Sequence, residues 1–201
     1  MKFKKFSKVI CYFIIFIMLI GSMVGADIPD FKVITDKKPI DKVQYDGYDF
    51  NVSRLRIQGS DNVIYCLEIT KKYPSGQVFS SIGNLSKNIE NVVAAGYPNR
   101  SFRALNLDNE DEAYFATQIA IWSAMQGYDV NKFKGSNPKI LDAIRNIYND
   151  GMSGKYANKI RTKAYKTNDE SIQEIITVLL DDLSAEQKAE SKQKEFPPQE
   201  G

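Results

Sequence analysis

The first hydrophobic segment of the chain lies between a basic start and a run of small residues. The lysine-rich "MKFKKFSK" precedes an apolar run of twelve residues, 9–20, and "GSMVGA" follows and ends at Ala26. This order is typical of a secretory signal peptide, so we predict that residues 1–26 are removed on export. An uncleaved membrane anchor is the alternative, but a spanning helix needs roughly 20 apolar residues.

Two segments in the first half of the remaining chain have the pattern of strands. Within residues 48–57, Leu55 and Ile57 alternate with Arg54 and Arg56 as in a half-exposed strand, and residues 63–70 are rich in β-branched and aromatic side chains on both faces. A polar stretch typical of a turn separates them. We predict a hairpin over 48–70, with Cys66 near the middle of a second strand that is covered on both sides. Irregular chain is expected on either side, at 27–44 and 71–84.

The second half has the periodicity and the start and stop signals of helices. The clearest pattern opens at Asn109, with Glu112 three residues on as in a capping box, and ends at Gly127. Two further helices are predicted by a serine or a proline at their start and a glycine at their end. They cover 86–96 and 137–151, and Gly151 is expected just past the end of the second.

The last part of the chain is ambiguous. A weaker helical pattern covers 168–189, but "EIITVLL" within it also fits a strand, so segment 172–183 can be either. Residues 186–201 are polar and contain a diproline, which is typical of a linker to a downstream region. Strands followed by helices indicate an α+β fold with a strand-rich part at 27–85 and a helix-rich part at 86–185.

The net charge of the chain changes sign when the predicted signal peptide, the leader, is removed. The chain has 27 basic and 25 acidic residues, a net +2, and the leader contains four lysines and no acidic residue, so the mature chain has 23 minus 25, or −2. The basic excess belongs to the leader. Nothing in the mature chain therefore indicates a nucleic-acid partner.

Cysteine and histidine usage narrows the chemistry. Cys66 is the only cysteine after residue 26, and the chain has no histidine. Catalytic triads, Cys-His dyads and zinc sites built on imidazole are therefore excluded. An unpaired cysteine in an exported protein indicates a reactive thiol or an intermolecular disulfide, although a small buried side chain is the simplest explanation. Glu68 shares the strand face of Cys66 and is a candidate for proton transfer, but we favour a structural role.

Gln118 is the second unusual residue, because it lies in the apolar helix "FATQIAIWSAM". Tyr114 and Trp122 lie one turn away at i−4 and i+4, and Phe115 lies at i−3. A buried amide without partners costs about 1–3 kcal/mol, so we expect it to be satisfied, in the simplest case by a backbone group. If the two halves pack at this point, the Cys66 thiol can attack the Gln118 carboxamide, expel ammonia and form an internal thioester.

These residues also resemble a known family. "IYCLE" around Cys66 and "TQIAIW" from Thr117 to Trp122 are similar to the two motifs of the thioester domains of Gram-positive surface adhesins, and "AAGYPN" at 94–99 resembles a segment that such domains carry between the motifs. The resemblance implies that 27–185 form a thioester domain: a small antiparallel β-sandwich or barrel-like sheet packed on an all-helical part. The Cys66–Gln118 thioester would lie at their junction.

The resemblance also implies a function. A lysine amine of a host extracellular protein, for which fibrinogen is a possible type of target, would attack the Gln118 carbonyl and leave a covalent link. Aromatic residues near the pair and the threonine of the second motif would bind the amine or shield the thioester from water. These residues are Tyr65, Tyr114, Phe115, Thr117 and Trp122. Each domain would react only once, because the reaction consumes the thioester, so the domain is not expected to be an enzyme. The resemblance implies no metal or cofactor. The mature protein would be secreted and held at the cell surface by downstream regions.

Two alternatives stay open. One is a non-covalent secreted or surface binding module in which Cys66 is packed and Gln118 is hydrogen-bonded. The other is a secreted protein that dimerises through Cys66. Acidic residues 108–112 resemble the start of a calcium loop, but Ala113 and Ile119 stand where that loop needs glycine and glutamate, so we interpret them as the ordinary acidic start of a helix.

Overall fold

A computed structural model describes residues 30–180. The predicted signal peptide, 1–26, and the predicted linker, 186–201, lie outside the described residues. Within the described part, no helix combines the length and the apolar character needed to cross a membrane. The elements are β1 (Phe31–Thr35), β2 (Asp41–Tyr45), β3 (Tyr48–Val52), β4 (Leu55–Ile57), β5 (Ile64–Cys66), β6 (Val78–Gly83), α2 (Lys87–Ala94), α3 (Glu110–Gln126), α4 (Pro138–Met152), β7 (Ile160–Lys166) and β8 (Ile175–Leu180).

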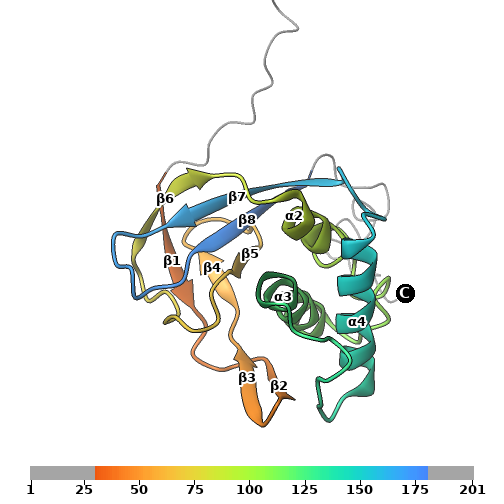
Figure 1. Ribbon diagram of the computed structural model, residues 1–201. Helices are drawn as coiled ribbons and strands as arrows, with labels where there is room; N and C mark the ends of the chain where they lie inside the picture. Colours follow the sequence, from red (N-terminus) through yellow and green to blue (C-terminus); the bar gives the residue numbers. More distant parts are fainter. Residues whose placement is uncertain (1–29, 181–201) are drawn as a thin grey trace, which may run out of the picture.

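Six strands form one antiparallel sheet in the order β4-β1-β6-β7-β8-β5. The two edge strands of this order, β4 and β5, lie against each other, so the sheet curls into a nearly closed barrel (Figure 1). Inward side chains such as Val33, Phe79 and Ile175 are buried and fill it. Strands β2 and β3 form a separate hairpin that extends from the barrel toward the helices.

The three described helices pack against one another on one side of the barrel, with α2 next to β7 and α3 next to β5 (Figure 1). Every residue of α3 from 113 to 123 is buried, as expected for a helix that is apolar all round. Its ends follow the sequence signals: the Asn109 side chain accepts a hydrogen bond from the Glu112 N–H at 2.9 Å, and Gly127 closes the helix in the left-handed conformation, at φ 72°. The predicted position of this helix is confirmed.

The other two helices differ from expectation only at their ends. Ser86 precedes α2, but its side chain makes no capping hydrogen bond. Pro138 begins α4 as predicted, whereas Gly151 lies inside the last turn and not beyond it. A Cβ atom on Gly151 would stand 2.4 Å from the Cα of Val92, so this glycine lets α2 and α4 approach closely.

The predicted hairpin over 48–70 is wrong. Residues 48–52 pair with β2, residues 55–57 pair with β1, and residues 64–66 pair with β8. Strands β4 and β5 pair with β1 and β8, which are distant in sequence, because burial of both faces of β5 needs the barrel and the helices. Strand β3 forms its hairpin with the neighbouring β2 instead. The segments expected to be irregular, 27–44 and 71–84, contain β1, β2 and β6.

The ambiguous segment near the C-terminal end is a strand. Residues 175–180 form β8, and the first four of them are buried, so the β-branched character of "IITV" decides between the two possibilities. The helical interpretation of 168–189 is therefore wrong over its described part. Strand β7 also lies in the part expected to be helix-rich. The predicted α+β class, a barrel-like sheet packed on a helical part, is confirmed.

Candidate functional site

Cys66 is the last residue of β5 and its side chain is fully buried. It pairs with Ile175 of β8, and the following residue continues the pairing, since the Leu67 N–H donates to the Glu174 carbonyl at 2.9 Å. Burial raises the pKa of the Cys66 thiol well above its ordinary value, and the nearby Glu68 carboxylate adds to the rise. The thiol is therefore neutral at physiological pH. All three residues of β5 are buried, so the strand is covered on both faces as predicted.

Gln118 lies near the middle of α3, and its carboxamide binds the backbone of Cys66 at two points. The amide Nε2 donates to the Cys66 carbonyl and the amide Oε1 accepts from the Cys66 N–H, each at 2.8 Å. Only 1% of Gln118 is exposed. The backbone partner expected for a buried amide is thus present, and it belongs to Cys66, the residue predicted to form a thioester with this amide.

This geometry is favourable for acyl transfer. The two hydrogen bonds hold the amide group of Gln118 beside residue 66, so the thiol and the carboxamide carbon belong to neighbouring groups with restricted motion. Attack on that carbon places negative charge on Oε1, which already accepts from a buried N–H. Such a preorganised donor stabilises the charge of the transition state, in the manner of an oxyanion hole.

Two stacked tyrosines neighbour the pair in the chain, since Tyr65 precedes Cys66 and Tyr114 lies one helical turn before Gln118. The rings of Tyr65 and Tyr114 stack with centroids 4.6 Å apart. Their hydroxyls donate to the Tyr97 carbonyl at 2.6 Å and to the Ile64 carbonyl at 2.8 Å. Burial raises the pKa of both well above the ordinary value, so they act as neutral donors. They tie α3 and β5 to the loop that follows α2.

The other residues predicted at the site have separate surroundings. Phe115 is fully buried in the core. The Trp122 side chain is 1% exposed, lies along an aromatic cleft, and has an indole N–H with no partner among the described residues. Thr117 donates to the Ala113 carbonyl and accepts from the Tyr97 N–H at 3.0 Å, and a Cβ on Gly96 would stand 2.5 Å from its hydroxyl. Thr117 therefore holds the 96–97 loop and is not directed toward an incoming amine.

Sequence reasoning missed Arg54 and Tyr73. Arg54 was expected on the exposed side of a strand, yet its guanidinium lies 4.8 Å from the Tyr114 ring centroid and pairs with Asp111 at 3.0 Å. The Tyr73 hydroxyl donates to the Asn51 carbonyl at 3.1 Å. Neither has a local signal, because each reaches the site through tertiary contacts. Tyr97 had a signal, the "AAGYPN" segment, and burial raises its pKa to about 12.

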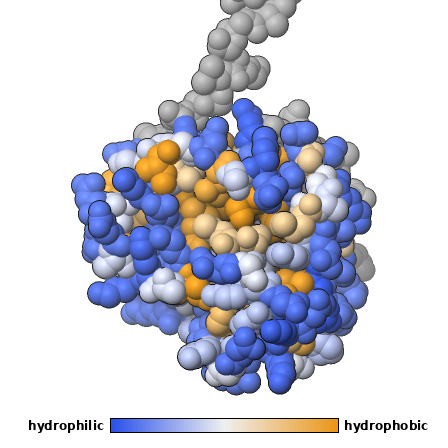
Figure 2. Space-filling view, viewed as in Figure 1, coloured by the Kyte–Doolittle hydropathy of each residue, from blue (hydrophilic) through white to orange (hydrophobic). Residues whose placement is uncertain are grey.

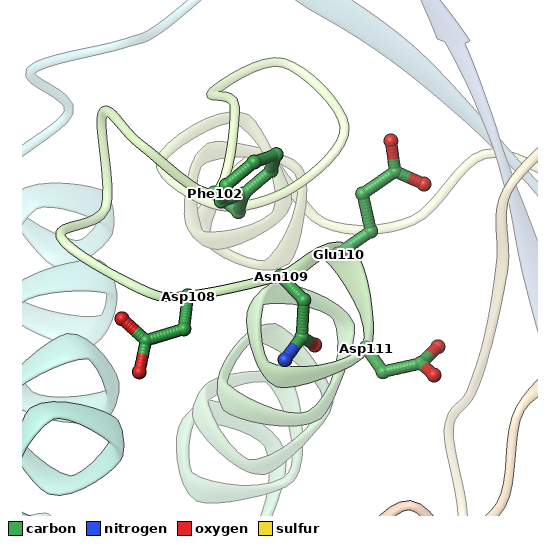
Figure 3. A pocket seen from close by; sticks show the side chains of 5 residues that line it. All are labelled: Phe102, Asp108, Asn109, Glu110 and Asp111. Atoms are coloured by element: carbon green, nitrogen blue, oxygen red, sulfur yellow. The ribbon is translucent and has the colours of Figure 1, made fainter.

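Charged groups near the pair have structural partners. Glu68 accepts from the Glu174 N–H at 3.0 Å and pairs with Lys71 at 2.8 Å, so it joins the end of β5 to the start of β8. The acidic start of α3 forms a shallow pocket, and its side chains point in different directions (Figure 3). No group of residues suited to a metal ion occurs in the described part of the chain. The interpretation of 108–112 as an acidic helix start agrees with this geometry.

The pair lies at the junction of sheet and helices. On the face shown in Figure 2, apolar residues gather at the centre, where the sheet meets the helices, and polar residues surround them. Cys66, Gln118 and their aromatic neighbours are each 1% exposed or less. Water is therefore excluded from the surroundings of the pair. Such surroundings would protect a thioester from hydrolysis.

Comparison with known proteins identifies this arrangement. The family model described as "Thioester domain" matches residues 63–153, which include both Cys66 and Gln118. The chain therefore contains a thioester domain. No curated protein matches the chain.

Solved thioester domains of Gram-positive surface adhesins share the fold. The N-terminal domain of the Streptococcus pyogenes pilus tip adhesin Cpa is similar with a TM-score of 0.56 at 16% identity, over 79% of this chain and 96% of that chain. The N-terminal thioester domain of the fibronectin-binding protein SfbI from S. pyogenes has a TM-score of 0.54 at 18% identity, over 78% and 95%. The Bacillus anthracis TIE protein has a TM-score of 0.57 at 14% identity over 76% of this chain, which spans only 39% of that protein.

Proposed function

We propose that this thioester domain forms an internal thioester between Cys66 and Gln118 and uses it to attach covalently to a host protein. The Cys66 sulfur attacks the Gln118 carboxamide carbon, the C–N bond breaks, and the nitrogen leaves as ammonia with the thiol proton. A lysine amine of the target then attacks the same carbon. The C–S bond breaks, the amine loses a proton to the sulfur, and an amide links the two proteins.

One observation carries the proposal. The Gln118 carboxamide forms two 2.8 Å hydrogen bonds with the backbone of Cys66, the only cysteine among the described residues. Forming a thioester from an amide is uphill in open solution, and restricted geometry can contribute roughly 7–11 kcal/mol toward the barrier. The burial of both residues protects the product from water.

The reaction consumes the bond, so the domain acts as a single-use covalent adhesin module and not as a turnover enzyme. Its partner is a protein outside the producing cell that presents a lysine, and a fibrinogen-like protein is one candidate. We place the mature chain at the cell surface, attached through regions downstream, because its structural neighbours are parts of surface proteins and pilus tips.

Intact mass spectrometry of the secreted chain tests the proposal. The thioester predicts a mass lower than calculated by one ammonia and no titratable thiol. Methylamine should then add to the protein and release one thiol. Cys66→Ala and Gln118→Ala should each show their full calculated mass. Gln173→Ala is the matched control, because Gln173 is also buried, and it should retain the ammonia loss.

A structural role for the same residues is the second candidate. The hydrogen bonds that position the Gln118 amide also satisfy it, as a purely structural glutamine would require. This alternative predicts the full calculated mass and one thiol that titrates only after unfolding. A dimer through Cys66 is disfavoured by the complete burial of that residue, and a doubled mass that reductant halves would establish it.

A further inference from the structure

An aromatic cleft opens beside the reactive pair. It has a volume of about 630 Å³, and the β2–β3 hairpin forms one wall. The segment that follows β5 and the end of α3 form the rest. Its lining residues are Tyr45, Asp46, Tyr48, Asp49, Phe50, Asn51, Ile69, Thr70, Tyr73, Trp122 and Tyr128.

Both reactive elements contribute to this cleft. Trp122 lies one helical turn after Gln118 on α3. Ile69 and Thr70 follow Cys66 closely in the chain. Tyr73 joins this segment to the hairpin, since its hydroxyl donates to the Asn51 carbonyl at 3.1 Å. Burial is the main reason that the pKa of Tyr73 is raised, and Cys66 also contributes. The floor of the cleft is therefore next to the site.

The chemistry of the cleft fits a cationic side chain. Asp46 and Asp49 are the charged residues among its described lining, and aromatic rings form most of its walls. Aromatic faces and carboxylates both attract an ammonium group. Asp49 already pairs with Lys42 at 2.8 Å, whereas Asp46 is exposed at the hairpin turn. The buried, unpartnered indole N–H of Trp122 also offers a donor to a peptide carbonyl.

A second cleft lies on the opposite side of Gln118 along α3, beside Tyr114. It has a volume of about 480 Å³ and is lined by two arginines, Arg54 and Arg56, together with Asp61 and Glu110. The Arg54 guanidinium covers the Tyr114 ring. A cationic amine that enters here would meet this guanidinium first, so like charges disfavour the route.

The geometry points to the aromatic cleft between the β2–β3 hairpin and Trp122 as the entrance for the attacking amine, with a preference for lysine in an extended peptide. This inference rests on the proposed thioester. The ammonium is attracted by Asp46 and Asp49, loses one proton to solvent at the floor, and attacks the Gln118 carbonyl as a neutral amine. The C–S bond then breaks, and the sulfur leaves with the second proton.

A matched pair of bulky substitutions tests the entrance. Thr70→Trp fills the aromatic cleft and Gln58→Trp fills the second one; both positions are exposed and line their clefts. The rate of adduct formation with a short acetylated peptide that contains one lysine is followed by intact mass. We expect Thr70→Trp to slow the reaction on the order of tenfold, because a displaced amine loses its proximity to the carbonyl. Gln58→Trp should react like the unmodified protein.

Charge is tested separately. Asp46 has φ 47°, a conformation that asparagine also adopts readily, so Asp46→Asn changes charge with little change in backbone. At low salt this substitution should lower the rate of adduct formation with the lysine peptide by about twofold to threefold. The difference should vanish at high salt. Reaction with hydroxylamine, which is neutral at pH 7, should not change. Asp61→Asn in the second cleft is the control.

The outcomes separate the two claims. If the unmodified chain shows no ammonia loss, the proposed thioester fails. If the ammonia loss is present but Gln58→Trp and Asp61→Asn slow the lysine peptide more than Thr70→Trp and Asp46→Asn, the entrance is the second cleft and the inference is wrong. Equal rates for all four variants also overturn it. A variant whose mass is still lower by one ammonia has formed the thioester and is therefore folded.

Discussion

At the scale of single residues, the two polar atoms of the Gln118 carboxamide make its hydrogen bonds in the fold and also belong to the group that reacts in the proposed thioester formation. Its oxygen and nitrogen both bind the Cys66 backbone, so replacing the Cys66 side chain leaves these bonds in place. Replacing Gln118 removes them. The structural and chemical roles of the pair can therefore be measured apart.

Cys66→Ala and Gln118→Glu should differ in stability although neither can form the thioester. Gln118→Glu loses the donor to the Cys66 carbonyl and sets an oxygen against it. We expect it to unfold in urea with a free energy about 1–3 kcal/mol lower than that of Cys66→Ala. Equal stabilities would mean that the amide contributes nothing to the fold.

The Cys66 thiol should ionise only at high pH in a variant that cannot form the thioester. Burial raises the pKa of Cys66, so the folded state favours the neutral thiol. Its contribution to stability is present below the pKa of the unfolded chain and is lost as the pH rises through the higher folded value. In Gln118→Met, alkylation of the folded protein should therefore rise only above the ordinary thiol pKa of 9.0. The urea-unfolded chain should titrate near that value, and identical profiles would contradict the prediction.

The sequence was sufficient to select Cys66 and Gln118, because each is chemically out of place: one thiol without a partner and one amide in an apolar helix. Arg54 and Tyr73 could not be selected in this way. An arginine in an alternating strand and a tyrosine in a loop are ordinary, and only the tertiary contacts bring them to the site. Thr117 fits the motif, but its hydroxyl is used by the backbone of α3 and by Tyr97.

At the scale of elements, helices and strands differ in how local their causes are. The three helices have start and stop residues inside their own segments, and α2 and α4 also have an apolar face with a 3.6-residue period, so their positions could be predicted closely. The strands are short, and β5 finds its hydrogen-bond partners in β8, far along the chain. A local hairpin was therefore predicted in place of this long-range pairing, and β7 was not predicted at all.

The contact between α2 and α4 depends on one glycine. An added Cβ at Gly151 would stand 2.4 Å from the Val92 Cα, which is backbone and cannot turn away. Gly151→Ala should lower the free energy of unfolding by about 1–3 kcal/mol, even though alanine favours helix by up to about 1 kcal/mol. Met152→Ala, at an exposed neighbouring position, is the control and should change the urea midpoint little.

At the scale of the whole molecule, the barrel and the helical part meet at Cys66 and Gln118. Strand β5 supplies Cys66, and α3 supplies Gln118. Strand β8 holds β5 in place through three register pairs. The site is therefore a product of the complete fold and not of either half.

A truncation tests this dependence. A chain that ends at Leu180 contains every described strand, whereas a chain that ends at Glu174 lacks β8. The longer chain should show the ammonia loss of a thioester, and the shorter one should show its full mass and a thiol that alkylates readily. Ammonia loss in the shorter chain would show that β8 is not needed to assemble the pair.

The pairing of β5 with β8 also sets an order of events during biosynthesis. A ribosome makes Cys66 well before Ile175, its partner in the sheet, so the cysteine passes through synthesis as part of an unpaired segment. If the proposed thioester forms, its acylating power arises only after β8 has been made and folded. If the chain is exported unfolded, the producing cell handles an inert precursor, and the reactive bond first exists outside, where the amines around it belong to other proteins.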